Sequence, residues 1–157
     1  MTSPSRNLLV VYHTRSGGTQ AMTDAVVDGA TDDEITGVDV RVLRAPDATA
    51  ADVQHADAIV LGTPENFGYM AGLMKDFLER IYYPCLDATV GRPYALYVKA
   101  STDGDGAVRS VERIVAGLRW NAVRPPFVVV GDAQPADLEH CWELGATMAA
   151  GLEAGIF

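Results

Sequence analysis

The chain has 157 residues, of which 48% are hydrophobic and 21% charged, a composition typical of one soluble globular domain spanning residues 1–157. Its net charge of −9, without any basic run, argues against binding to nucleic acid or to an anionic membrane surface. No apolar run approaches the roughly 20 residues of a membrane helix, and the polar N-terminus resembles no secretory signal, so we expect a cytoplasmic protein without membrane insertion.

Short apolar runs alternate along the chain with helical patterns. The runs are continuous rather than alternating, as expected for strands that helices cover on both faces. Because each helical crossover returns the chain to a parallel neighbour, the pattern predicts an α/β fold with an open, doubly wound sheet. The expected strands are Leu8–Tyr12, Val38–Leu43, Ala58–Leu61, Tyr94–Val98 and Phe127–Val130.

The segments between these runs carry apolar stripes with helical spacing, which predict core-facing helices. The Ala- and Asp-rich segment 45–56 predicts a short helix at most. Trp120 is expected to be half-buried in packing, with a homodimer contact as the alternative. The stripes consist of Met22, Ala25, Val26 and Ala30; of Met70, Leu73, Met74, Phe77, Leu78 and Ile81; of Val108, Val111, Ile114, Val115 and Leu118; and of Leu138, Cys141, Trp142, Gly145, Met148, Ala149 and Leu152.

The cysteines and histidines show no metal-binding pattern. Cys85 and Cys141 are far apart and form no Cys-x-x-Cys motif, which argues against a zinc site or a dithiol redox centre. His13, His55 and His140 are not spaced as ligands of one ion. We therefore expect two reduced structural thiols and no metal.

The turn after the first expected strand, residues 12–20, reads Tyr-His-Thr-Arg-Ser-Gly-Gly-Thr-Gln and leads directly into a helix. Such a turn gathers backbone N–H groups and the positive end of the helix dipole around one anion. It lacks the motifs of nucleoside triphosphate and dinucleotide sites, so we interpret it as a cradle for a single terminal phosphate, with an ordinary helix cap as the alternative. Hydroxyl donors are Thr14, Ser16 and Thr19, and close backbone approach is possible at Gly17 and Gly18.

Two further turns are expected at the same edge, because ligands of such sheets bind beyond the carboxyl ends of the strands. Segment 62–72, Gly-Thr-Pro-Glu-Asn-Phe-Gly-Tyr-Met-Ala-Gly, offers Phe67 and Tyr69 as flat surfaces for an aromatic ligand. Segment 99–106, Lys-Ala-Ser-Thr-Asp-Gly-Asp-Gly, combines glycines with small polar side chains. Three such turns are stronger evidence for a ligand site than one. Glycines expected to let backbone approach the ligand are Gly62, Gly68 and Gly72.

These turns resemble those of the flavodoxin-like FMN-binding family. Thr14, Ser16, Gly17 and Thr19 are similar to the family's Ser/Thr-x-Ser/Thr-Gly-x-Thr phosphate motif. Segment 62–72 is similar to the version in NAD(P)H:quinone reductases of the tryptophan repressor-binding protein branch and in NADPH-dependent FMN reductases. The resemblance implies a three-layer flavodoxin-like fold, with a five-stranded parallel sheet in the order 2-1-3-4-5 and helices on both faces.

The resemblance also implies where FMN binds. The phosphate lies at Thr14–Thr19, and the isoalloxazine ring lies between the second and third turns. Backbone of Ser101–Gly104 meets the O2/N1 edge of the ring, and backbone of Glu65–Gly68 meets its N5/O4 edge. No catalytic or metal-binding side chain is implied. The implied FMN-binding residues are Thr14, Arg15, Ser16, Gly17, Gly18, Thr19, Thr63, Pro64, Glu65, Asn66, Phe67, Gly68, Ser101, Thr102, Asp103 and Gly104.

The sequence departs from the family pattern at two places. Arg15 stands where a small residue is common, and it either adds charge to the phosphate site or points to solvent. Segment 99–106 has no aromatic residue, whereas electron-carrier flavodoxins stack a tyrosine on the ring there, so one face of the ring is expected to be open. The chain is also shorter than the quinone reductases, so their tetramer is not expected.

Three functions follow, because flavin supplies the chemistry and the protein supplies position and electrostatics. An NAD(P)H-dependent oxidoreductase would pass hydride through FMN N5 to a quinone or similar small-molecule electron acceptor, and the open ring face favours it. A flavodoxin-type electron carrier between redox protein partners is favoured by the short chain and the charge of −9. A relative that has lost flavin and serves as a structural or regulatory domain is the third.

Overall fold

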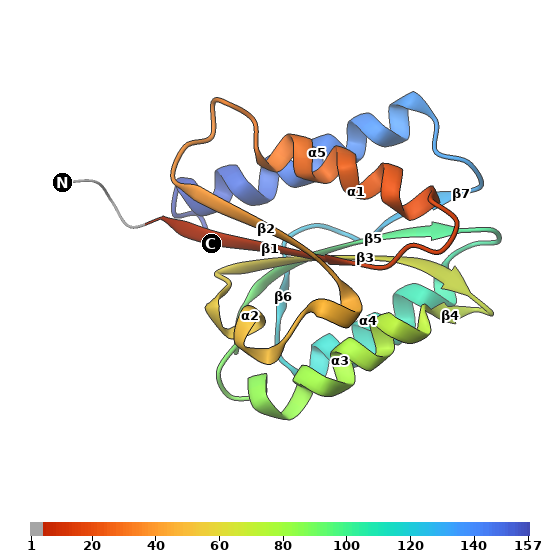
Figure 1. Cartoon of the computed structure of the whole chain (residues 1–157), viewed down its shortest axis with the longest axis horizontal. Helices are drawn as coiled ribbons and strands as arrows, with labels where there is room; N and C mark the ends of the chain where they lie inside the picture. The colour runs from red at the N-terminus through yellow and green to blue at the C-terminus, as the bar shows by residue number, and fades with distance from the viewer. Residues whose placement is uncertain (1–4) are drawn as a thin grey trace.

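The structure, a computed structural model, describes residues 5–157 as one sheet with helices on both sides (Figure 1). Within these residues, no helix has the length and apolar character needed to cross a membrane. The strands are β1 (Arg6–Tyr12), β2 (Val38–Arg44), β3 (Ala58–Asn66), β4 (Tyr69–Met70), β5 (Pro93–Ala100), β6 (Asn121–Ala122) and β7 (Phe127–Val130). The helices are α1 (Gly18–Ala30), α2 (Ala50–His55), α3 (Gly72–Cys85), α4 (Asp105–Gly117) and α5 (Pro135–Glu153), with a short 3-10 helix, η1 (Ala45–Asp47).

The parallel strands run in the order β2-β1-β3-β5-β7, which confirms the expected flavodoxin-like order of the five long strands. Two short strands add to it, since β6 pairs with the start of β5 and β4 folds back on β3 as an antiparallel hairpin. The expected short second crossover is also confirmed, as η1 and α2.

Helices α1 and α5 cover one face of the sheet, and α2, α3 and α4 cover the other (Figure 1). Alternate residues of β1 divide between the two cores, because successive side chains of a strand point to opposite faces. Leu8 and Val10 belong to the core beneath α1 and α5, and Leu9 and Val11 to the other, all at most 2% exposed. Each such side chain stabilises the fold by about 1.5–3 kcal/mol.

Helices α1 and α5 pack backbone to backbone through two glycines. A Cβ atom on Gly29 would lie 1.9 Å from the carbonyl oxygen of Trp142, and one on Gly145 would lie 1.8 Å from that of Val26. The expected burial of Trp142 is wrong, since its side chain is 40% exposed. Its backbone, rather than its indole, meets α1, so the bulky ring lies at the flank of the helix pair.

Other local expectations also differ from the structure. Leu73, expected on the buried stripe, is 43% exposed, whereas Trp120, expected to be half-buried, is only 6% exposed. The Trp120 indole N–H donates to the Thr89 hydroxyl at 2.8 Å, which satisfies its polar atom inside the core. Strand β3 continues to Asn66, so the predicted second turn narrows to Phe67 and Gly68.

Candidate functional site

The three predicted turns lie at one edge of the sheet, where β1, β3 and β5 end. The strand register fixes this arrangement, since Tyr12 pairs with Gly62 and Pro64 pairs with Lys99. The N–H of His13 also donates to the carbonyl oxygen of Gly62 at 3.0 Å. The turn after β1, the β3–β4 hairpin and the turn after β5 are therefore neighbours.

The turn after β1 presents unused backbone donors. Gly17, with φ of 93°, is the N-cap of α1 and provides no side-chain cap. Its own N–H donates to the Thr14 hydroxyl oxygen at 3.0 Å. Among residues 5–157, the N–H groups of Gly18, Thr19 and Gln20 find no acceptor, as expected for the first turn of an uncapped helix. Together with the helix dipole, these groups form a site for an anion.

Cationic side chains surround this turn. Arg44, the last residue of β2, donates from Nη2 to the carbonyl oxygen of Thr14 at 3.1 Å. The Lys99 side chain lies against Gly18, where a Cβ atom would be 3.0 Å from the lysine Cε. Arg15, in the turn itself, is exposed. The turn after β1 is therefore a cationic region of a chain that carries a net charge of −9.

His13 responds to this environment. Burial lowers the pKa of its imidazole below the ordinary value of 6.5, and the nearby Arg44 and Arg15 lower it further. Its Nδ1 atom is buried and makes no hydrogen bond with residues 5–157. Partial burial and two neighbouring guanidinium groups therefore disfavour the charged form of the imidazole.

The β3–β4 hairpin places an aromatic ring at its tip. Phe67 and Gly68 form its two-residue turn with φ of 54° and 68°, the positive values that such short hairpin turns require. A bulky residue in this conformation is strained, and the Phe67 side chain is fully exposed, at 104%. The fold thus holds Phe67 with a strained backbone and a solvent-facing phenyl ring, beside the other two turns.

Two residues of segment 62–72 serve packing. Thr63 is completely buried, its hydroxyl donating to the Pro64 carbonyl oxygen at 2.9 Å and accepting the Ala71 N–H at 3.0 Å, which closes the base of the hairpin. A Cβ atom on Gly62 would lie 2.1 Å from the ring of Tyr97, so this glycine makes room for a core tyrosine rather than for a ligand.

The turn after β5 is fixed at both ends. The Thr102 hydroxyl donates to the Glu65 carboxylate at 2.9 Å, linking this turn to β3, and the Asp103 carboxylate accepts the Asp105 N–H at 2.9 Å at the start of α4. Gly104 has φ of 77°, and a Cβ atom there would lie 2.6 Å from a Val128 methyl carbon, so only glycine fits.

The predicted FMN-binding residues differ in their exposure to solvent. Thr19, Thr63 and Gly104 are buried, and all the others reach the surface at least partly. Two further residues of this edge, Arg44 and Lys99, were missed by sequence reasoning, although each is a cation near the carboxyl end of a strand that ends here. The residues that reach the surface of this edge at least partly are Thr14, Arg15, Ser16, Gly17, Gly18, Pro64, Glu65, Asn66, Phe67, Gly68, Ser101, Thr102 and Asp103.

Comparison with known proteins gives consistent matches. Residues 14–135, more than half of the chain, match the family described as NADPH-dependent FMN reductase. The flavodoxin of Aquifex aeolicus is 38% identical over 74 residues, covering 47% of this chain and 39% of that protein. An NAD(P)H dehydrogenase (quinone) of Solidesulfovibrio magneticus is 25% identical over 173 residues, covering 92% of this chain and 84% of that protein. A solved flavodoxin from the domain Archaea has a TM-score of 0.82 at 22% identity, covering 94% of this chain and 99% of the other.

These matches bear on the expectations drawn from the three turns. The solved structure confirms the flavodoxin-like fold. The family match confirms the resemblance, with FMN as the cofactor and an NAD(P)H-dependent oxidoreductase as the enzyme class. The chain belongs to the NADPH-dependent FMN reductase family.

Proposed function

We propose that the chain binds FMN where β1, β3 and β5 end and uses NAD(P)H to reduce a quinone or similar small acceptor. The observation that carries this proposal is one juxtaposition. The turn after β1, with its unused N–H donors and flanking cations, lies beside the β3–β4 hairpin that exposes Phe67, because β1 and β3 are neighbouring strands. A phosphate and a planar ring on one ligand need such a pair of neighbouring surfaces.

The FMN phosphate fits the turn after β1. The first N–H groups of α1 supply hydrogen bonds, and Arg44 and Lys99 supply positive charge on either side. The Thr14 hydroxyl accepts the Gly17 N–H, which leaves its own proton for a phosphate oxygen. Charge-assisted hydrogen bonds of this kind each contribute about 1.5–3 kcal/mol.

The isoalloxazine ring fits between the hairpin and the turn after β5. Backbone of residues 65–68 and of residues 101–104 would hold the two polar edges of the ring, as the family resemblance implies. Phe67 at the hairpin tip, whose side chain is fully exposed, would be available to cover one side of the ring. The turn after β5 has no aromatic residue to cover the other, so a nicotinamide has room to stack there.

When bound, FMN supplies the hydride chemistry, and the chain supplies position and charge. The bond from Thr102 holds the Glu65 carboxylate beside the ring site, so the negative charge of Glu65 is fixed there. Lys99 and Arg44 keep the phosphate end in place. The hairpin, anchored by the Thr63 bonds to Pro64 and Ala71, would hold the backbone of this turn in place beside the ring.

A second candidate function is an electron carrier between redox proteins. The fully exposed Phe67 favours it, because a protruding phenyl ring suits a protein surface, and so does the net charge of −9, which suits docking to a basic partner. This function requires no nicotinamide at the open face.

Anaerobic reduction separates the two candidates. Protein reconstituted with FMN is titrated with NADPH and then NADH, and the visible absorbance of the flavin is followed against free FMN at the same concentration. Bleaching faster than that of free FMN, reversed by adding a quinone, supports the oxidoreductase. A bound flavin that stays oxidised with both nucleotides, yet is reduced by dithionite, overturns it in favour of the carrier.

A further inference from the structure

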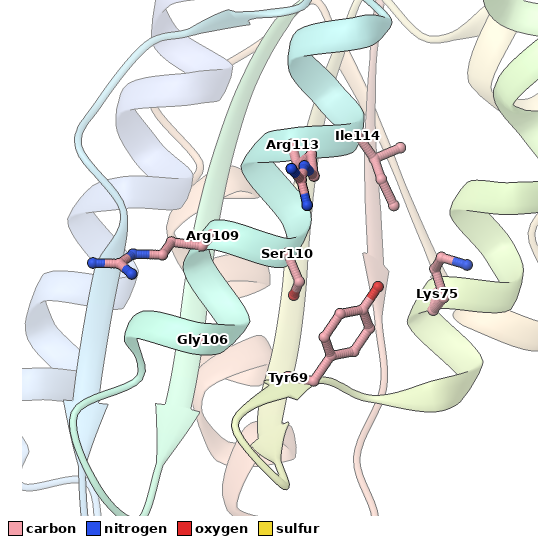
Figure 2. Close-up of a pocket in the computed structure, with 7 residues that line it drawn as sticks. All are labelled: Tyr69, Lys75, Gly106, Arg109, Ser110, Arg113 and Ile114. Carbon is pink, nitrogen blue, oxygen red and sulfur yellow. The ribbon is translucent and has the colours of Figure 1, made fainter.

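A pocket of about 560 Å³ lies between α3 and α4, beside β4 (Figure 2). Its volume is in the range of small-molecule sites, roughly 300–1,000 Å³. Its lining includes none of the residues that the resemblance implies for FMN, although Tyr69 was considered in the sequence as a surface for an aromatic ligand. Its lining includes Tyr69, Lys75, Arg109, Ser110, Arg113 and Ile114.

The pocket is cationic in an acidic protein. Lys75, Arg109 and Arg113 line it, and no aspartate or glutamate does. Lys75 is partly offset by Glu79, whose carboxylate is 3.4 Å from the lysine Nζ. Within residues 5–157, Arg109 and Arg113 form no salt bridge. Because the chain has only 12 lysines and arginines against 21 acidic residues, this grouping favours an anionic ligand.

An aromatic ring lies among these cations. Figure 2 shows the Tyr69 ring between Lys75 of α3 and the side chains of Ser110 and Arg113 on α4, while Arg109 extends away at the outer edge. The ring is 41% exposed. The backbone beside it is tied to α4, because the Ser110 hydroxyl accepts the N–H of the neighbouring Met70 at 3.1 Å. The pocket therefore pairs a partly exposed aromatic ring with two nearby cationic side chains.

The pocket also borders the proposed ring site. Tyr69 follows the hairpin turn directly, and a Cβ atom on Gly106 would lie 1.8 Å from the carbonyl oxygen of Gly68, so α4 touches the hairpin backbone. A ligand that stacks on the flavin and continues past the hairpin would enter the pocket. Its second half would need a planar group and a phosphate.

We propose that this pocket holds the 2′-phosphorylated adenosine half of NADPH. Adenine stacks on Tyr69, and Arg113 and Lys75 bind the 2′-phosphate. The proposal rests on the oxidoreductase function above and adds a donor preference, because NADH lacks that phosphate. Loss of contacts to a charged group predicts a discrimination of about tenfold or more in favour of NADPH.

Binding of nucleotide fragments tests the pocket without any turnover. Isothermal calorimetry on the FMN-loaded protein compares 2′,5′-ADP, 3′,5′-ADP and 5′-AMP. The proposal expects 2′,5′-ADP to bind about tenfold or more tightly than 5′-AMP. Equal binding of 2′,5′-ADP and 5′-AMP would overturn the proposal. Equal binding of the 2′- and 3′-phosphates would also overturn it, since the pocket would then recognise phosphoadenosines in general.

Substitutions locate the binding. The double variant Lys75→Gln/Arg113→Gln is expected to lose the preference for 2′,5′-ADP and to remain folded, since neither side chain belongs to the core. Arg124→Gln is the matched control, because Arg124 donates to the Thr147 hydroxyl away from this pocket. An unchanged preference in the double variant assigns the 2′-phosphate elsewhere and overturns the proposal.

Flavin reduction separates this proposal from the function on which it rests. If NADPH and NADH bleach the bound flavin at equal kcat/KM, the oxidoreductase function holds and the pocket assignment fails. If neither nucleotide bleaches it while 2′,5′-ADP still binds through Lys75 and Arg113, the proposed function fails and the phosphoadenosine site holds. Selective loss of NADPH-dependent reduction in the double variant supports both.

Discussion

Thr102 donates its hydroxyl hydrogen to the Glu65 carboxylate at 2.9 Å, a bond between residues 37 positions apart in the sequence. It joins the turn after β5 to the end of β3, the two segments between which we propose that the flavin ring lies. Both residues stand at the surface edge of the sheet, so the bond contributes little to overall stability. Its effect is to hold two ligand-binding segments at a fixed separation.

We expect this bond to couple the two segments in FMN binding. Thr102→Ala and Glu65→Ala are each expected to weaken FMN binding. In the double variant the loss of binding free energy should be smaller than the sum of the two single losses by about 0.5–1 kcal/mol, because the second substitution removes a side chain whose partner is already gone. Fluorescence titration of FMN measures all four proteins, with Thr102→Ser as the variant that keeps the hydroxyl. Strictly additive losses would show that the bond does not act in binding.

Lys99 and Arg44 are expected to distinguish FMN from riboflavin. Lys99→Gln removes a cation that lies against the start of α1, so FMN affinity should fall by about tenfold, while riboflavin, which lacks the phosphate, should bind as before. Arg44→Gln should act in the same direction. Parallel titrations with the two flavins measure the difference, with Arg6→Gln, at the opposite end of β1, as control. Equal weakening of both flavins would remove these cations from the phosphate site.

The strands were predictable because they depend on local patterns, whereas their order in the sheet was expected only from the resemblance to the flavodoxin-like family. Continuous apolar runs such as Leu8–Val11 are buried on both faces wherever helices cover both sides of a sheet, and the structure places them so. The three turns were predictable for a related reason. Parallel strands bring their carboxyl ends to one edge, so the turns that follow them gather at that edge.

Features that depend on pairs of distant residues were not predictable. Gly62 resembles a ligand-approach glycine in the sequence, but the ring of Tyr97 occupies the space a side chain would need. Trp142 lies on a helical stripe, and only the backbone contact with Gly29 shows why its ring is turned outward. Arg44 and Lys99 join the phosphate turn through three-dimensional contacts that no local spacing encodes.

The glycine contact between α1 and α5 is expected to control stability. Gly145→Ala places a methyl group 1.8 Å from the carbonyl oxygen of Val26, so the helices must separate, and the free energy of unfolding should fall by about 1–3 kcal/mol despite the better helix propensity of alanine. Urea unfolding measures the change. Gly72→Ala is the matched control, since nothing lies within 4 Å of its Cβ position. Similar stability of both variants would contradict the close helix packing.

His13 is expected to make the FMN-free protein less stable as the medium becomes acidic. Its folded-state pKa is lowered, first by burial and then by Arg44 and Arg15. Between the two pKa values the imidazole therefore binds a proton more readily in the unfolded chain than in the folded chain. The loss of stability therefore begins as the pH falls through the ordinary value of 6.5 and is complete below the folded-state pKa. Urea unfolding at a series of pH values measures it, and His13→Gln should remove this component.

FMN should reverse the shift at His13, because a phosphate anion in the turn after β1 favours the charged imidazolium and offsets Arg44 and Arg15. The pKa of His13 should therefore rise on FMN binding, with proton uptake between its free and bound pKa values. Proton NMR of the imidazole C–H signals follows this directly, since the chain has only three histidines. His55, at the end of α2 just before β3 begins, lies at the opposite edge of the sheet, so its C–H signals serve as the internal reference. A riboflavin complex that raised the His13 pKa as much as FMN would show that the phosphate lies elsewhere.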